Sequence, residues 1–199
     1  MKRDDLLKEL QDLRRKIAQI EIELEAPQVK AWPPKDYYTT YYILAGFVLG
    51  FFGAAASLLF NVIGSIIVQQ HPLQLIRVFL TFPLGADALA IDSGATLALG
   101  CCLYLVTGSV YGAIFHVLLT RFFVRQSIFE HWIIATFMGL ALWVFNFYGV
   151  LSWAQPMFFG GSWIVDMIPI WVAALTHVIF IWTVFVLGSW GRFTSENYS

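Results

Sequence analysis

Hydrophobic positions fall into four long runs in the last four-fifths of the chain. They cover about residues 40–69, 93–122, 131–153 and 164–190. A helix that crosses the apolar core of a bilayer needs roughly 20 such residues, and each run reaches that length. The pattern predicts an all-α integral membrane protein whose four transmembrane helices lie within a domain over residues 40–190.

The segment between the first two runs is shorter and is interrupted by prolines and glycines. Within it one set of polar residues recurs at helical spacing, namely Gln70, Gln74, Arg77 and Thr81. A helix with one polar stripe suits the membrane interface, and the sequence Pro83-Leu84-Gly85 is expected to end it. We expect an interfacial helix at about residues 71–83.

The first 26 residues follow a heptad pattern instead. Apolar residues recur there at alternating intervals of four and three, at Leu6, Leu10, Leu13, Ile17, Ile20 and Leu24. So narrow an apolar stripe does not stabilise a helix alone. Residues 6–24 are therefore expected to pack on a neighbouring surface, or to form a coiled coil with a partner or a second copy. A linker rich in proline and aromatic residues follows over residues 27–39.

Charge is concentrated in the N-terminal arm. Residues 1–36 hold eight Lys/Arg and eight Asp/Glu, whereas the rest of the chain holds four and five. With the arm inside the cell, Arg121, Arg125 and Arg192 also lie inside and only Arg77 lies outside, as the positive-inside rule requires. We expect a multi-pass protein of the bacterial inner membrane with a cytoplasmic N-terminus and a cytoplasmic tail over residues 191–199. The net charge of −1 gives no indication of nucleic-acid binding.

Small and amide residues recur along the predicted spans. Small residues let helix backbones approach closely, and amides hydrogen-bond between helices. We expect seven such residues to make helix–helix contacts, namely Gly46, Gly50, Gly53, Asn61, Gly108, Gly112 and Asn146. The remaining apolar and aromatic surface is expected to hold bound lipid.

Catalytic and metal-binding motifs are not found in the sequence. It contains no HExxH, no GxSxG and no glycine-rich phosphate loop. No charged residue lies deep in a predicted span, where it would mark an ion path. Cys101 and Cys102 are adjacent, which gives neither a disulfide framework nor zinc spacing. We expect no catalytic residues and no metal site of the chain's own, although the protein can still belong to an enzyme complex.

Haem b remains the alternative cofactor hypothesis, with His116 and His177 as the candidate ligands. His116 lies five residues from Arg121, about 7–8 Å along a helix, and His177 lies fifteen residues from Arg192, about 22 Å. Two axial ligands must lie at similar depth on facing helices. The mismatch of about 15 Å favours a structural role for both histidines and no cofactor of the chain's own.

Four stretches occur in an order that resembles a known group of proteins. They are the proline-started segment from Pro72 to Phe82, then GSVYGAIFH, GLALWVFNFYGVLSWAQP and ALTHVIFIWTVFVLG. Over residues 40–190 the chain resembles small uncharacterised four-helix bacterial membrane proteins, often encoded beside respiratory oxidase or cytochrome genes. The resemblance excludes the heptad arm. It implies association with an electron-transfer complex and supplies no catalytic residues.

Together these features favour a non-catalytic accessory subunit of a larger membrane complex, respiratory or otherwise devoted to electron transport. Its expected partners are other membrane subunits, the lipid bilayer and a coiled-coil partner or second copy. Two alternatives stay open. A small channel or carrier would need a water-accessible path past Asn61, Asn146 and His177, and a haem-binding membrane subunit would use the histidines named above.

Overall fold

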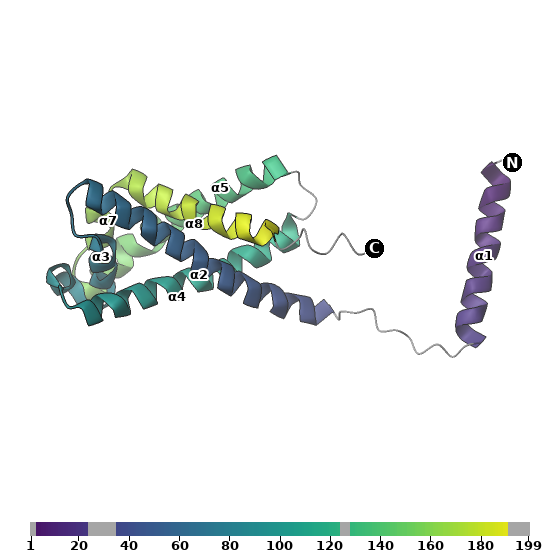
Figure 1. Cartoon of the computed structure of the whole chain (residues 1–199), viewed down its shortest axis with the longest axis horizontal. Helices are drawn as coiled ribbons and strands as arrows, with labels where there is room; N and C mark the ends of the chain where they lie inside the picture. The colour runs from purple at the N-terminus through teal and green to yellow at the C-terminus, as the bar shows by residue number, and fades with distance from the viewer. Residues whose placement is uncertain (1–2, 24–34, 124–127, 191–199) are drawn as a thin grey trace. The chain divides into compact units, whose positions relative to one another are not determined.

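The computed structural model describes residues 3–23, 35–123 and 128–190, and within these ranges it contains helices and no strand. The chain forms two compact units, residues 1–38 and residues 39–199. Figure 1 colours both along the sequence.

The N-terminal unit contains helix α1 (Arg3–Glu23). Four residues of the heptad stripe are about half exposed, with exposed fractions of 48% at Leu6, 47% at Leu10, 54% at Leu13 and 55% at Ile17. Nothing in the described part of this unit covers them. Leu24 and residues 27–34 of the expected linker lie outside the described residues, and the last expected linker residues begin helix α2.

The second unit contains four helices that are long and apolar enough to cross a membrane. These spans are Thr39–Ile67 of α2 (Lys35–Ile67), Gly94–Phe122 (α4), Ile128–Phe159 and Ile170–Trp190 (α8). The third span begins as α5 (Ile128–Val144), continues through a π-helical segment, η2 (Phe145–Leu151), and ends as α6 (Ser152–Phe159). The all-helical, multi-pass membrane class predicted from the hydrophobic runs is therefore confirmed.

Two span boundaries differ by six residues from those predicted, and the others by three or fewer. The third span continues to Phe159 because Pro156 is tolerated within α6, where Gly160 at φ 81° then ends the helix. The fourth begins at Ile170 because the expected start forms a separate short helix, α7 (Trp163–Met167). Ile168 is extended, with ψ 117°, as is usual for a residue that precedes a proline.

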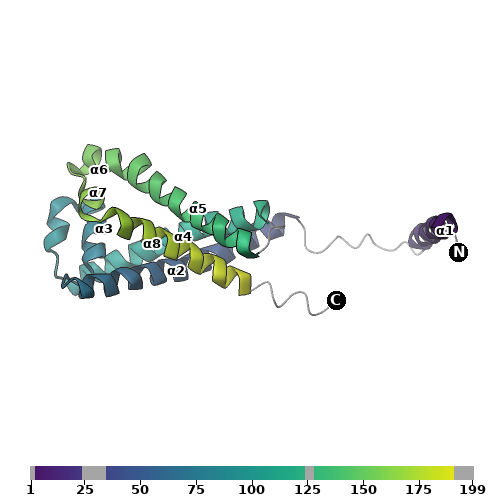
Figure 2. The same cartoon turned by 90° about the horizontal axis from the view of Figure 1, so that it is seen from above.

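Helix α8 makes the central contacts of the bundle. Its residues Phe180, Ile181 and Val184 are buried in one cluster with Ala54 of α2, Phe115 of α4, and Ala135 and Leu142 of α5. Figure 2 shows α8 lying between α2 and α5. Glycines allow these approaches: a Cβ added at Gly139 of α5 would lie 2.8 Å from the Ile181 side chain and 3.1 Å from the His177 carbonyl.

One end of the bundle is closed by α3 (Gln74–Leu84), the 3₁₀ turn η1 (Gly85–Ala90) and α7 (Figure 1). Gly85 ends α3 at φ 69°, a conformation that favours glycine. The predicted polar stripe is covered only at its end: Gln70, before the helix, is exposed and Gln74 is half-buried. Thr81 is completely buried, and the Arg77 side chain is 13% exposed and hydrogen-bonds to Asp92 and to the Ile91 carbonyl. Thr81 and most of Arg77 are covered because α3 packs against α4, α6 and α7 at once.

Candidate functional site

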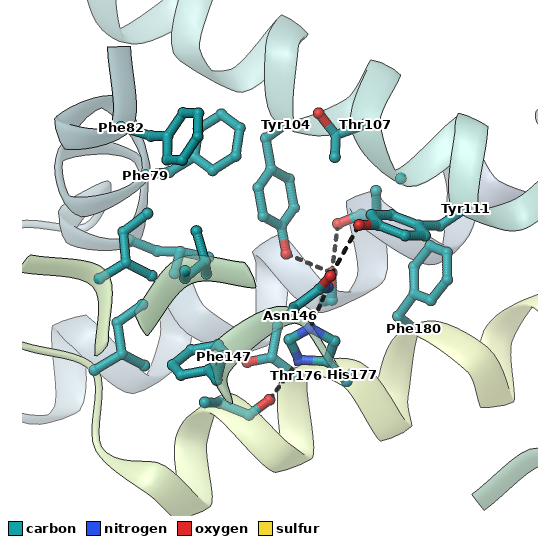
Figure 3. Close-up of a pocket in the computed structure, with 18 of the residues that line it drawn as sticks. Phe79, Phe82, Tyr104, Thr107, Tyr111, Asn146, Phe147, Thr176, His177 and Phe180 are labelled. Atoms are coloured by element: carbon teal, nitrogen blue, oxygen red, sulfur yellow. Dashed lines mark hydrogen bonds between the residues drawn. The ribbon is translucent and has the colours of Figure 1, made fainter. Parts of the chain in front are cut away.

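A cavity of about 470 Å³ lies between α3, α4, η2 and α8, with α2 at its base. Six aromatic rings line it, namely Phe79, Phe82, Tyr104, Tyr111, Phe147 and Phe180 (Figure 3). Binding sites for small molecules commonly have volumes of roughly 300–1,000 Å³ and a mostly apolar lining with a few placed polar groups. Both the volume of this cavity and its mostly apolar lining match such a site.

A chain of hydrogen bonds crosses the cavity from α4 to α8. The Tyr111 hydroxyl donates to the Asn146 amide oxygen over 2.9 Å, and the Asn146 amide nitrogen lies 3.3 Å from His177 Nε2. His177 Nδ1 lies 2.7 Å from the Ala173 carbonyl. Because a carbonyl only accepts, Nδ1 carries the proton and Nε2 accepts from Asn146. Three elements far apart in the sequence thus meet through Asn146.

The π-helical segment is what presents Asn146 to both partners. A π-helical turn is wider than an α-helical turn, and such turns occur frequently at functional sites. Phe147, the next residue, is buried against Val78, Ile164 and Ala173. The segment therefore places an amide and a core-packed aromatic ring at adjacent positions of the cavity lining.

A second polar group lies on the α2 side of the cavity. The Ser57 hydroxyl donates to the Ala54 carbonyl over 2.9 Å and lies 2.9 Å from the Tyr104 hydroxyl, which must then be the donor between them. Asn61, buried beside the cavity, donates to the Thr176 hydroxyl on α8 over 2.9 Å. This bond connects α2 to α8 across 115 positions of sequence.

The cavity reaches the molecular surface along α4 and at the end of α3. Among its lining residues Leu103 and Thr107 of α4 and Pro83 of α3 are exposed. Leu103 and Thr107 lie near the middle of the span Gly94–Phe122. The opening along α4 is therefore at the side of a helix long and apolar enough to cross a membrane.

The predicted packing glycines lie where helices α2, α4 and α8 approach one another. A Cβ added at Gly46 would lie 2.7 Å from His116 Cβ, and one at Gly112 would lie 2.6 Å from the Gly46 carbonyl oxygen. Gly50 and Gly108 contact each other through the Gly108 carbonyl, and a Cβ at Gly53 would lie 2.9 Å from the Phe180 carbonyl oxygen. With Asn61 and Asn146, the structure places all seven of these residues between helices.

His116 and His177 lie in different surroundings. His116 is buried beside Gly46 of α2 and Gly188 of α8, and its ring centroid is 5.8 Å from that of Tyr42. His177 lines the cavity, and His116 does not. The structure therefore does not bring the two candidate haem ligands into one site. Within the described ranges, no group of three or more His, Cys, Asp or Glu side chains is arranged to hold a metal ion.

Three residues that organise this region were not among the predicted site residues, namely Ser57, Tyr104 and Gln155. Tyr104 and Tyr111 are seven residues apart on α4 and so share a face, a signal that was available. Gln155 lies two residues past the predicted end of the third span and is completely buried. No family model matches the chain, and comparisons with curated proteins and with solved structures found no match.

Proposed function

We propose that this protein is a non-catalytic accessory subunit of a larger membrane complex of the respiratory or electron-transfer kind. One observation carries the proposal that the chain assembles through α1: the Leu/Ile stripe of this helix is half exposed within its own unit. A helix of this length with a narrow apolar stripe gains its stability by packing on another helix. The kind of complex is proposed only from the sequence resemblance described above for residues 40–190.

The charges of α1 favour a second copy of the chain as the helical partner. With Leu13 at a d position and Leu10 and Ile17 at a positions, Glu9 is a g residue and Arg14 an e residue. In a parallel pair, a g residue lies beside the e residue five positions later on the partner helix. Glu9 would then face Arg14, and the sequence repeats the opposite-charge pattern at Lys16 and Glu21.

Parallel pairing also agrees with a shared membrane orientation. Two copies inserted in the same direction present their arms on the same side of the bilayer. The arm and Arg121 hold many more Lys and Arg residues than the opposite side, where only Arg77 lies, and this favours the cytoplasm of a bacterium for the arm.

The membrane unit offers apolar surface for lipid and for other subunits. A groove on the outer face of α5 and η2 is lined by Phe137, Leu140, Ala141, Val144, Phe145, Tyr148 and Gly149. Because lipid chains are as apolar as these side chains, burial against protein there depends on close packing. We propose bound lipid or a partner helix in this groove.

Extraction from the native membrane in a mild detergent tests the proposed function. The protein should migrate as part of an assembly much larger than two copies, together with subunits whose cofactors give a visible spectrum. A species of one or two copies alone, obtained under conditions that preserve other membrane complexes, would overturn the proposal.

A matched pair of arm variants separates the role of the stripe from general effects. Leu13→Glu puts a charge in the apolar stripe, whereas Gln11→Glu puts the same charge on the opposite, solvated face. Leu13→Glu should abolish crosslinking between arms and release the protein from the assembly, while Gln11→Glu should change neither. Equal behaviour of the two variants would contradict the role given to α1.

A further inference from the structure

We propose that the cavity binds a lipid-soluble ring compound that carries a hydroxyl group, the chemistry of a phenol or a hydroquinone. This site goes beyond the role of an accessory subunit and does not depend on it. A cavity of about 470 Å³ accommodates a ring with part of an apolar tail. The aromatic side chains that surround it favour offset-stacked or edge-to-face contacts with an aromatic ring.

The hydroxyl protons of the cavity are already donated within the protein. Tyr111 donates to Asn146, Tyr104 donates to Ser57, and Thr107 donates to the Leu103 carbonyl. Thr176 donates in the same way to the Val172 carbonyl, and His177 to the Ala173 carbonyl. The oxygen atoms of Tyr104, Tyr111 and Thr107 keep lone pairs that accept further hydrogen bonds.

One donor of the cavity remains for a ligand. The Asn146 amide has two N–H groups and uses one of them on His177. Among the described residues, the second N–H of Asn146 has no hydrogen-bond acceptor. A ligand hydroxyl can accept from this N–H and donate to a tyrosine oxygen, whereas a carbonyl or an ether can only accept. The pattern of unused groups therefore selects a hydroxyl.

The position of the opening along α4 indicates a medium from which the ligand can enter. Leu103 and Thr107 are exposed near the middle of the α4 span, where the surrounding medium is hydrocarbon. A molecule that enters there must be soluble in lipid. Figure 3 shows Thr107 and Tyr104 on the α4 side of the cavity and Asn146 with His177 across from them.

Binding to the full chain in phosphatidylcholine nanodiscs tests the proposal. The probes are a prenylated benzohydroquinone kept reduced without oxygen, its quinone, its dimethyl ether and 4-nonylphenol, with empty nanodiscs to correct for partition into lipid. The hydroquinone or the phenol should bind about tenfold more tightly than the dimethyl ether, the value of one buried hydrogen bond of about 1.4 kcal/mol. If the hydroquinone and the phenol bind equally tightly, one ligand hydroxyl is sufficient. If the hydroquinone binds more tightly, both of its hydroxyl groups contribute.

Three variants locate the site. Asn146→Leu removes the free amide donor and leaves the Tyr111 hydroxyl able to donate to any ligand acceptor. It should therefore reduce the preference for a hydroxyl to about threefold or less. Thr107→Phe fills the exposed mouth and should abolish saturable binding. Tyr148→Phe removes a hydroxyl from η2 outside the cavity and should change nothing. The proposal is overturned if the quinone or the dimethyl ether binds as tightly as the hydroquinone, if no probe binds above the empty-disc level, or if Thr107→Phe binds normally.

Discussion

Thr81 of α3 and Gln155 of α6 hydrogen-bond over 2.8 Å, although 74 positions of sequence separate them and both side chains are completely buried. The Gln155 amide oxygen also accepts from the backbone N–H of Ile164 over 3.0 Å. One side chain thus connects α3, α6 and α7. It explains why the segment between the first two spans packs at the end of the bundle as part of the membrane domain.

Replacing Gln155 by leucine should lower the free energy of unfolding by about 1–3 kcal/mol, because it leaves the Ile164 N–H buried without an acceptor. Thermal unfolding in detergent, followed by circular dichroism, measures the change. Gln70→Leu is the matched control, since Gln70 is exposed. A Gln155→Leu protein as stable as this control would contradict the structural role of the hydrogen bonds.

Gly112→Ala should destabilise the bundle by about 1–3 kcal/mol because the added methyl group collides with backbone that cannot move aside. Its Cβ would lie 2.6 Å from both the Gly46 carbonyl oxygen and the Gly50 nitrogen. At Gly64, by contrast, an added Cβ meets no atom within 4 Å. Gly64→Ala should therefore leave the unfolding temperature unchanged or raise it, because alanine is the better helix former. Unfolding temperatures of the two variants at equal detergent concentration provide the comparison.

His116→Ala and His177→Ala should leave the visible spectrum of the complex unchanged. The two histidines lie in separate surroundings and do not form one ligand pair. Reduced-minus-oxidised difference spectra of membranes that contain each variant measure this. Loss of a haem band in both variants, with the other subunits still present, would restore the bis-histidine hypothesis.

Charge reversal tests parallel pairing of α1. Glu9→Arg places like charges together in a parallel pair and should weaken crosslinking between arms, by about 1 kcal/mol for the two symmetric contacts. Adding Arg14→Glu to the same chain restores opposite charges and should restore crosslinking. Because these residues are exposed, raised salt should reduce the difference between the variants. If the double variant pairs no better than Glu9→Arg, the parallel second copy is the wrong partner.

The sequence by itself determined the membrane class, the four spanning helices and helix α1. Length and hydrophobicity of a run are local properties, and in a bilayer every backbone polar group of a span must be satisfied within the helix. Because of that constraint, a long apolar run reliably predicts a membrane-spanning helix. The sequence also located the end of α3, where Pro83-Leu84-Gly85 was expected to stop the helix and Gly85 ends it.

Only the tertiary structure decided which polar groups meet. Tyr111, Asn146 and His177 come from three elements, and the width of the π-helical turn sets where Asn146 points. The stripe on α3 has the spacing of a water-facing helix, yet Thr81 is buried because Gln155 supplies its partner from 74 positions away. Helical periodicity shows that a face is polar. Whether water or another helix satisfies that face depends on non-local packing, which no single segment of sequence contains.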